Sequence, residues 1–193
     1  MGERVTERFG GGLYAVYAWA GCGACDRCER GDEHLCDDSQ HIGINRDGGF
    51  ATHVLAPDAR HLIDVDGIAP ELAGSLMCSG ITAYGAINRA KPFLEDRPLM
   101  VIGLGGVGLM AVRIARAVTN GPVIGADIDA AKRAAALAAG ATAVFDPRAD
   151  GARKAVLAVD GPCGAAVDFV GSCDTVAFAA GVTGKAAAIV IAG

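Results

Sequence analysis

Four of the seven cysteines of this chain lie close together between Gly21 and Cys36, in the stretch GCGACDRCERGDEHLC. Their spacing is Cys22-x2-Cys25-x2-Cys28-x7-Cys36. Zinc accepts a tetrahedron of four thiolates, and such a site has no open position for water or substrate, so it would be structural rather than catalytic. An iron–sulfur cluster also takes four cysteines with short gaps. The spacing therefore predicts a metal centre, with structural zinc as the first interpretation and a cluster as the alternative.

The composition excludes several classes of protein. Of the 193 residues, 52% are hydrophobic and 20% are charged, which predicts a globular chain. No apolar run reaches membrane-spanning length, and the start, MGERVTERFG, lacks the apolar core of a signal peptide. We therefore expect a cytoplasmic protein with reduced thiols and no membrane partner. The net charge of −5 argues against a nucleic-acid partner, although zinc ribbons also use four cysteines.

A second motif with chemical meaning is Gly103-Leu104-Gly105-Gly106-Val107-Gly108, where an expected strand meets an expected helix. In a dinucleotide site the first such glycine makes a tight turn, the second admits the pyrophosphate and the third lets helix and strand pack closely. Asp127 follows Gly108 by nineteen residues and ends the next expected strand. A carboxylate there accepts hydrogen bonds from the adenosine ribose and repels a 2′-phosphate, which favours NAD over NADP. The alternatives are that Asp127 caps the following helix, or that the fold binds a flavin or S-adenosylmethionine.

The elements that must position these motifs change character near Ala69. Before it the chain is β-rich with long loops, and we expect strands at Leu13–Trp19, Phe50–Ala56 and His61–Val65. After it, short apolar strands alternate with helical patterns, which predicts βαβ units and a parallel sheet. The expected strands are Leu99–Gly103, Val123–Ala126, Ala141–Phe145, Ala165–Val170 and Ala186–Ile191, and the expected helices are residues 107–118, Ala130–Ala139, Arg153–Val159 and Thr175–Ala180.

The two motifs and their order resemble the zinc-containing alcohol dehydrogenases of the medium-chain dehydrogenase/reductase family. Gly2-Glu3-Arg4-Val5, Gly48-Gly49-Phe50-Ala51 and Met77-Cys78-Ser79-Gly80-Ile81-Thr82-Ala83-Tyr84 are similar to the family's G-D-R-V, G-G-Y-A-E and L-C-A-G-x-T-x-Y. The resemblance implies an α/β protein: a partial GroES-like β-rich catalytic domain at 1–79, then a partial Rossmann doubly wound parallel sheet at 80–193. It also implies a homo-oligomer.

The resemblance further implies a reaction, namely reversible hydride transfer between an alcohol and NAD+ that gives an aldehyde or ketone. Polyol-type zinc dehydrogenases of the same family are the nearest rivals. Cys78 would be a ligand of the catalytic zinc, and Thr82 would lie near the nicotinamide. The structural zinc would be held by Cys22, Cys25, Cys28 and Cys36, and NAD by Gly103, Gly105, Gly106, Gly108, Asp127 and Lys132. From the residues alone, the favoured interpretation of Lys132 is a solvated helix residue.

The sequence also departs from the family. Family members carry a further catalytic-zinc cysteine and a G-H-E motif ahead of G-D-R-V, and neither occurs in these 193 residues. We therefore expect the chain by itself to hold one zinc rather than two and to oxidise no alcohol. The alternative class is a non-catalytic remnant that keeps zinc and nucleotide binding. His34, His41, His53 and His61 are expected to be solvated or sheet-surface residues, and Cys163 and Cys173 small buried or loop residues. Asp168 is expected near the coenzyme edge of the sheet, with a structural role as the alternative.

Overall fold

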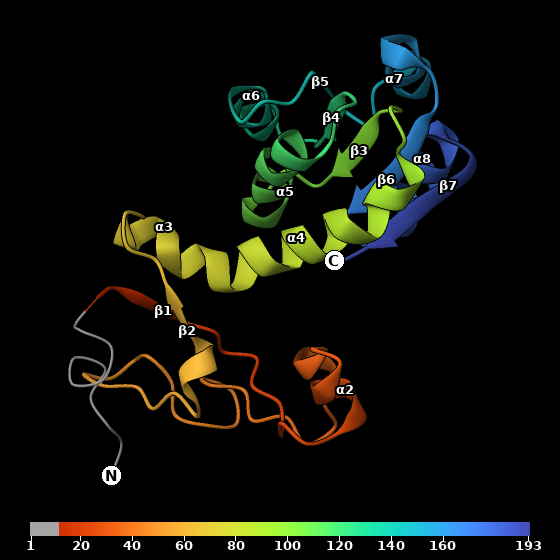
Figure 1. Ribbon diagram of the computed structural model, residues 1–193. Helices are drawn as coiled ribbons and strands as arrows, with labels where there is room; N and C mark the ends of the chain where they lie inside the picture. The colour runs from red at the N-terminus through yellow and green to blue at the C-terminus, as the bar shows by residue number, and fades with distance from the viewer. Residues whose placement is uncertain (1–11) are drawn as a thin grey trace. The chain divides into compact units, whose positions relative to one another are not determined.

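The computed structural model describes residues 12–193 and divides the chain into two units, with the division between Met77 and Cys78 (Figure 1). The motif Gly2–Val5 lies outside the described residues. In the described part of the chain, no helix is both long enough and apolar enough to cross a bilayer.

Regular structure is sparse in the first unit. Strand β1 (Tyr14–Val16) pairs antiparallel with β2 (Leu62–Asp64), so that Ala15 lies opposite Ile63. Further backbone hydrogen bonds lengthen this ladder at both ends, from Tyr17 N to His61 O (2.7 Å) and from Val65 N to Leu13 O (3.1 Å). Helices α2 (Asp26–Glu29) and α3 (Pro70–Ser75) complete the unit together with short 3-10 turns at Glu33–Leu35 and Ala59–His61.

The core of the first unit is small. Ala15, Val65 and Ala73 are buried together, and Met77 packs against them. Pro70 begins α3, a position at which proline's fixed φ is favourable and its missing N–H costs no hydrogen bond. Helix α3 thus begins where proline is favourable and supplies Ala73 to this core.

The strand expected at Phe50–Ala56 is absent, and this prediction was wrong. The segment has no regular secondary structure, and Phe50, Val54 and Leu55 are exposed. Its sequence has β propensity, but a strand also needs a partner with which to exchange backbone hydrogen bonds. No strand of residues 12–193 pairs with it.

The second unit contains a five-stranded parallel sheet, as the alternating pattern predicts. The strand order is β5-β4-β3-β6-β7, so the chain moves outward from β3 in one direction and then returns to the other side of β3. The carboxyl end of β3 is therefore the point where the order reverses, which is where ligands bind in open α/β sheets. The strands are β3 (Leu99–Ile102), β4 (Val123–Ala126), β5 (Ala143–Phe145), β6 (Cys163–Asp168) and β7 (Thr183–Ile191).

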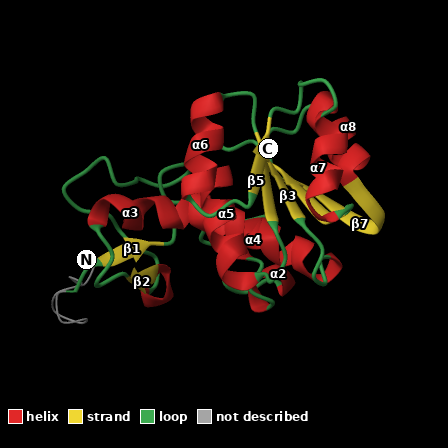
Figure 2. Cartoon of the chain, turned by 90° about the horizontal axis from the view of Figure 1, so that it is seen from above, coloured by secondary structure: helices red, strands yellow, loops and turns green. Residues whose placement is uncertain are grey.

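Helices cover both faces of this sheet, and Figure 2 shows the strands between them. On one face α4 (Ile81–Ala90), α5 (Gly106–Val118) and α6 (Ala130–Ala138) pack over one core cluster. On the other, α7 (Ala152–Asp160) and α8 (Cys173–Val182) pack over a second cluster. Every residue of the central strand β3 is buried, which explains its unbroken apolar sequence. The expected doubly wound α/β fold is confirmed.

The boundaries differ from the predicted ones where caps and registers decide them. The capping box of Ser172 and Thr175 starts α8 at Cys173, two residues before the predicted start. Strand β6 begins at Cys163 rather than Ala165, and β7 begins directly after α8. The predicted strand Ala186–Ile191 largely coincides with the regular part of β7, in which Ala188 to Ile191 lie opposite Ala165 to Asp168.

Candidate metal centre and nucleotide site

The four clustered cysteines come together at the start of α2. Their sulfur atoms all lie within 4.8 Å of one another, and Cys28 and Cys36 are buried. The Sγ–Sγ separations are 3.6 Å for Cys25–Cys28, 3.8 Å for Cys25–Cys36 and 3.9 Å for Cys22–Cys28. A zinc tetrahedron with Zn–S bonds of about 2.3 Å has edges of about 3.8 Å. The spacing fits one zinc ion, whereas in an iron–sulfur cluster the cysteines ligate different iron atoms and stand farther apart.

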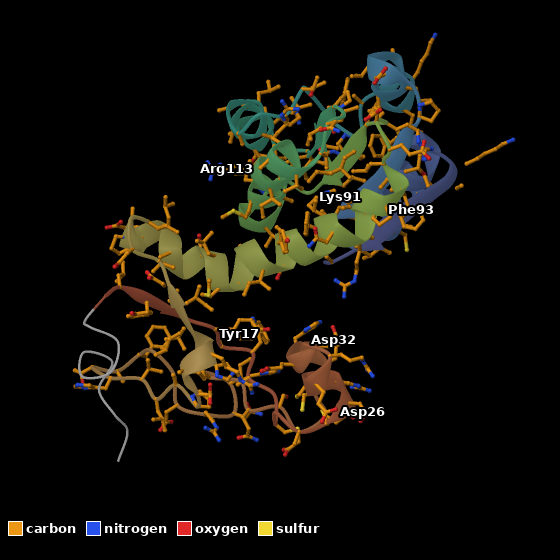
Figure 3. All side chains as sticks on the ribbon, viewed as in Figure 1. Tyr17, Asp26, Asp32, Lys91, Phe93 and Arg113 are labelled. Atoms are coloured by element: carbon orange, nitrogen blue, oxygen red, sulfur yellow. The ribbon has the colours of Figure 1, made fainter. Side chains whose placement is uncertain are left out.

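The backbone of the lobe, residues 21–36, is shaped to let the sulfurs converge. Gly21 has no room for a side chain, because a Cβ there would lie 2.5 Å from Cys28 Sγ. Gly23 has φ +80°, a conformation that favours glycine. The Cys22 N–H donates to Cys36 Sγ (3.4 Å). Asp26 and Asp32, labelled in Figure 3, lie on the same lobe.

The thiol pKa values indicate that the metal-free quartet does not ionise as a whole. Hydrogen bonds from the backbone and side chain of Cys28 lower the pKa of Cys25 to about 7. The Gly23 N–H lowers the pKa of Cys28, but burial and hydrogen bonds with neighbouring thiols outweigh it and raise that pKa to about 12. Four adjacent thiolates need a cation to balance their charge, so a metal would displace the remaining protons.

A carboxylate connects this lobe to the rest of the first unit. Glu33 Oε2 accepts a hydrogen bond from Gly21 N (3.2 Å) and lies 3.4 Å from His61 Nε2, while Oε1 lies 3.2 Å from Arg60 Nη1. The ring of Tyr17 stacks on His61 at a centroid distance of 6.1 Å. Burial and the charge of Glu33 raise the pKa of Tyr17.

The histidines divide into two groups. His34 and His53 are exposed, as expected, although His53 lies in a loop rather than a strand. The expectation for His61 was wrong: it is 1% exposed and its Nε2 lies 3.4 Å from Glu33 Oε2. His41 is half-buried, with its ring edge against Trp19 at 5.0 Å. A solvated histidine is the usual outcome, but nothing local in the sequence indicates the long-range contact with Glu33.

The glycine motif forms the loop between β3 and α5. Gly103 has φ +84°, and a Cβ there would lie 2.7 Å from a methyl of Val170. A Cβ on Gly108 would lie 1.8 Å from the carbonyl oxygen of Gly103, so only glycine allows the helix to pack this closely on the strand. Gly105 and Gly106 instead face open space, with no atom within 4 Å of a Cβ.

The start of α5 is suited to an anion. Gly105 is its N-cap and makes no side-chain cap, so the first N–H groups of the helix have no side-chain acceptor there. These groups and the positive end of the helix dipole face the open side of the glycine loop. This cradle fits the pyrophosphate of a dinucleotide.

Asp127 lies next to this loop at the end of β4 and is 9% exposed. Its Oδ2 accepts a hydrogen bond from Leu104 N (2.8 Å), and its Oδ1 accepts one from Asp129 N (2.9 Å). It does not cap α6, because Asp129 is the N-cap and accepts from the N–H groups of Ala131 and Lys132. The alternative reading of Asp127 as a helix cap is therefore wrong. The side chain of Lys132 is exposed on α6.

An arginine and a second aspartate flank Asp127, and no sequence motif indicated either of them. Arg133 Nη1 donates to the backbone carbonyl of Asp127 (2.7 Å) and lies 3.6 Å from Asp146 Oδ2. Asp146 follows β5, and its Oδ1 accepts from Arg148 N (2.9 Å). Because parallel strands end at one edge, the position of Asp146 just after β5 was a usable signal, whereas Arg133 gave none.

Three other predicted residues, Cys78, Thr82 and Asp168, lie outside the four-cysteine group. Cys78 is exposed on a π-helical turn, Leu76–Gly80, and belongs to no group of three or more metal-ligating side chains among residues 12–193. Thr82 is exposed in α4. Asp168 is fully buried at the carboxyl end of β6, where Oδ1 accepts from Val170 N and Gly171 N.

The two remaining cysteines differ in their surroundings. Cys163 begins β6 and is buried, and burial raises its pKa to about 11. Cys173 begins α8 and is exposed. Both are outside the quartet.

Comparisons with known proteins agree with this geometry. The family model "Alcohol dehydrogenase GroES-like domain" matches residues 1–67. The NAD-dependent alcohol dehydrogenase of Sulfurisphaera tokodaii is 41% identical over 142 residues, which are 70% of this chain and 41% of that protein. The enzyme of the same name from Saccharolobus solfataricus is 40% identical over an equal length, again 70% of this chain and 41% of that protein. The chain thus spans about two fifths of the length of these curated relatives.

Solved structures give the same result. The alcohol dehydrogenase of Aeropyrum pernix matches 94% of this chain with a TM-score of 0.81 and 30% identity, over 54% of its own length. The D-arabinose dehydrogenase of Sulfolobus solfataricus matches 94% of the chain with a TM-score of 0.87 and 27% identity, over 57% of its length. The chain, which carries both the four-cysteine lobe and the nucleotide fold, belongs to the zinc-containing alcohol dehydrogenases of the medium-chain dehydrogenase/reductase family and spans part of their length.

Proposed function

We propose that this chain is part of an NAD-dependent alcohol dehydrogenase that transfers hydride reversibly between an alcohol and NAD+ and gives an aldehyde or ketone. The observation that carries the proposal is that one chain combines the four-cysteine lobe with a glycine loop and Asp127 at the strand-order reversal. Its relatives at about 40% identity are named NAD-dependent alcohol dehydrogenases. The partner molecule would be a small alcohol, aldehyde or ketone.

The nucleotide half of the mechanism follows from the geometry of the loop. Gly105 and Gly106 leave room for the pyrophosphate, and the first N–H groups of α5 would hydrogen-bond its oxygens. Asp127 has one lone-pair direction of each oxygen occupied by a backbone N–H, and a carboxylate has about four such sites. The remaining sites would accept the adenosine ribose hydroxyls, and the charge would repel a 2′-phosphate.

The alcohol half of the mechanism requires the catalytic zinc of the family, which supplies Lewis acidity to the alcohol oxygen. We propose Cys78 as one of its ligands and Thr82, four residues later, as a residue that orients the nicotinamide end. The π-helical turn that carries Cys78 supports this role, because such turns are frequent at functional sites. We also propose that 1–79 and 80–193 are the partial catalytic and coenzyme domains, and that the complete protein is cytoplasmic and homo-oligomeric.

Calorimetric titration of the 193-residue chain with NAD and NADP tests the coenzyme assignment. We expect NAD to bind more tightly than NADP, and absence of NAD binding would contradict the proposal. An alcohol panel with NAD tests the reaction in a protein that joins this chain to the family segments it lacks. Turnover is expected there and not in the chain alone, because Cys78 belongs to no group of three or more metal-ligating side chains among residues 12–193.

A further inference from the structure

The side chain of Arg133 joins the carboxyl ends of two neighbouring strands. It comes from α6, donates to the backbone carbonyl of Asp127 after β4, and lies 3.6 Å from the carboxylate of Asp146 after β5. The side chain of Arg133 is 22% exposed and that of Asp146 is 27% exposed, so both are largely shielded from solvent. A charged donor on a backbone carbonyl at 2.7 Å is a strong hydrogen bond.

Each polar group of Asp127, in both backbone and side chain, makes a hydrogen bond. Its N–H donates to Phe145 O (3.2 Å), its two carboxylate oxygens accept from Leu104 N and Asp129 N, and its carbonyl accepts from Arg133. The first three contacts are all with backbone groups. Among these hydrogen bonds, only the one from Arg133 is made by the side chain of another residue. It is therefore the one that a substitution outside Asp127 can remove.

Asp146 keeps the arginine in place. Its Oδ1 accepts a hydrogen bond from Arg148 N (2.9 Å) and lies 3.6 Å from Arg148 Nε, which leaves Oδ2 directed at Arg133. The backbone N–H of Arg148, followed by the charges of both arginines, lowers the pKa of Asp146. The carboxylate is therefore charged at neutral pH and attracts the guanidinium.

We infer that Arg133, anchored by Asp146, is a positioning residue that fixes Asp127 for binding of the adenosine ribose. The inference rests on the proposed NAD site and deepens it. Hydrogen bonds to two ribose hydroxyls require the carboxylate oxygens to be placed within about 0.5 Å. Loss of the bond to the Asp127 carbonyl frees the turn that carries the carboxylate, and the affinity for the adenosine half of the coenzyme falls.

The experiment compares Arg133→Met with the unmodified 193-residue chain by calorimetric titration with NAD and with ADP-ribose, which lacks the nicotinamide. Arg153→Met is the matched control, because Arg153 on α7 also donates a hydrogen bond to a backbone carbonyl, that of Ala177, away from the glycine loop. We expect R133M to weaken binding of both ligands about tenfold, which one charged hydrogen bond accounts for. R153M should bind both as the parent chain does.

Two conservative variants show whether a loss of affinity comes from positioning, from the change of charge or from misfolding. Arg133→Lys keeps the charge but replaces the planar guanidinium, whose Nη1 faces both Asp127 O and Asp146 Oδ2, with a compact ammonium on a flexible stem, so it should bind NAD with an affinity between the parent and R133M. Asp146→Asn removes the charge that anchors Arg133 without removing any direct contact of Asp127, and should weaken NAD and ADP-ribose binding in the same direction. Circular dichroism checks that each variant is folded, and these two carry the comparison if R133M is not.

The possible outcomes test the positioning role of Arg133 separately from the proposed NAD site. Parental affinity in R133M, R133K or D146N while the parent chain binds NAD would overturn the positioning role alone. An equal loss in R153M would also overturn it, because the effect would then follow general destabilisation. Failure of the parent chain to bind either ligand would overturn the proposed coenzyme site and this inference with it.

Discussion

Glu33 offers a direct test of how the metal lobe is held. Its side chain is 13% exposed and contacts three groups: Gly21 N, His61 Nε2 and Arg60 Nη1. We expect Glu33→Ala to lower zinc affinity, because Gly21 precedes the first metal-ligating cysteine and Cys36 follows Glu33 by three residues. Without the carboxylate, the start of the lobe at Gly21 is no longer hydrogen-bonded to the turn that precedes Cys36.

The magnitude follows from the three contacts. The hydrogen bond from the Gly21 N–H to a charged acceptor contributes about 1.5–3 kcal/mol. The pair with Arg60 adds little, because the arginine side chain is 49% exposed. The pair with buried His61 counts only when the histidine is protonated. The expected loss of about 1.5–3 kcal/mol corresponds to roughly a 10- to 150-fold weaker zinc affinity if it acts entirely on the bound state.

The assay is competition for zinc between the protein and a chromogenic chelator at pH 7. Glu33→Gln keeps an acceptor for Gly21 N and should lose less affinity than Glu33→Ala. Glu29→Ala is the control, because it removes the same charge from the same lobe at an exposed side chain that makes no hydrogen bond or ion pair with residues 12–193. Equal zinc affinity in the Glu33→Ala and Glu29→Ala variants would refute the attachment.

Four further expectations concern coenzyme, packing, metal and pH. Asp127→Ser should weaken NAD binding and improve NADP binding in calorimetry; equal affinity of the parent chain for both would contradict this. Gly108→Ala should destabilise the second unit by about 3 kcal/mol or more in thermal unfolding, because its Cβ meets the Gly103 carbonyl. Gly105→Ala, which meets open space, should unfold like the parent but bind NAD less well. Metal analysis should find one zinc per chain, and its removal should lower the melting temperature of the first unit; two tightly held zinc ions or iron with sulfide would refute this. Asp146 has a lowered pKa in the folded chain, so its contribution to stability is present above its unfolded pKa of about 3.9 and is lost as the pH falls through the folded pKa. In Asp146→Asn the free energy of unfolding should therefore fall less steeply with decreasing pH over this range. The same pH dependence in the variant and the parent chain would contradict this.

The second unit was predictable because its signals are local and repeated. Strand β4 was predicted at its observed residues, and α6 within one, since an apolar strand and then Gly140 mark them in order, although the cap of α6 is Asp129 rather than Asp127. The quartet was predictable for the same reason: its four sulfurs come from one short segment. In both cases the residues that decide the structure are neighbours in the sequence.

Contacts between distant segments were not predictable. The strand expected at Phe50–Ala56 depended on a partner, and His61 owes its burial to Glu33, which is far from it in the sequence. The link from Arg133 to Asp127 and Asp146 requires α6 to lie across two strand ends at once. Such arrangements follow from topology, which spacing alone does not give.

The exposed segment from Phe50 to Ala56 has a consequence for how this chain behaves at high concentration. Its apolar side chains at Phe50, Val54 and Leu55 face solvent, and its backbone pairs with no strand of the described chain. An unpaired segment with β propensity and little charge is a template for intermolecular strand pairing. The isolated chain should therefore self-associate with rising concentration, and a lysine in place of Val54 should raise its solubility without disturbing zinc or nucleotide binding.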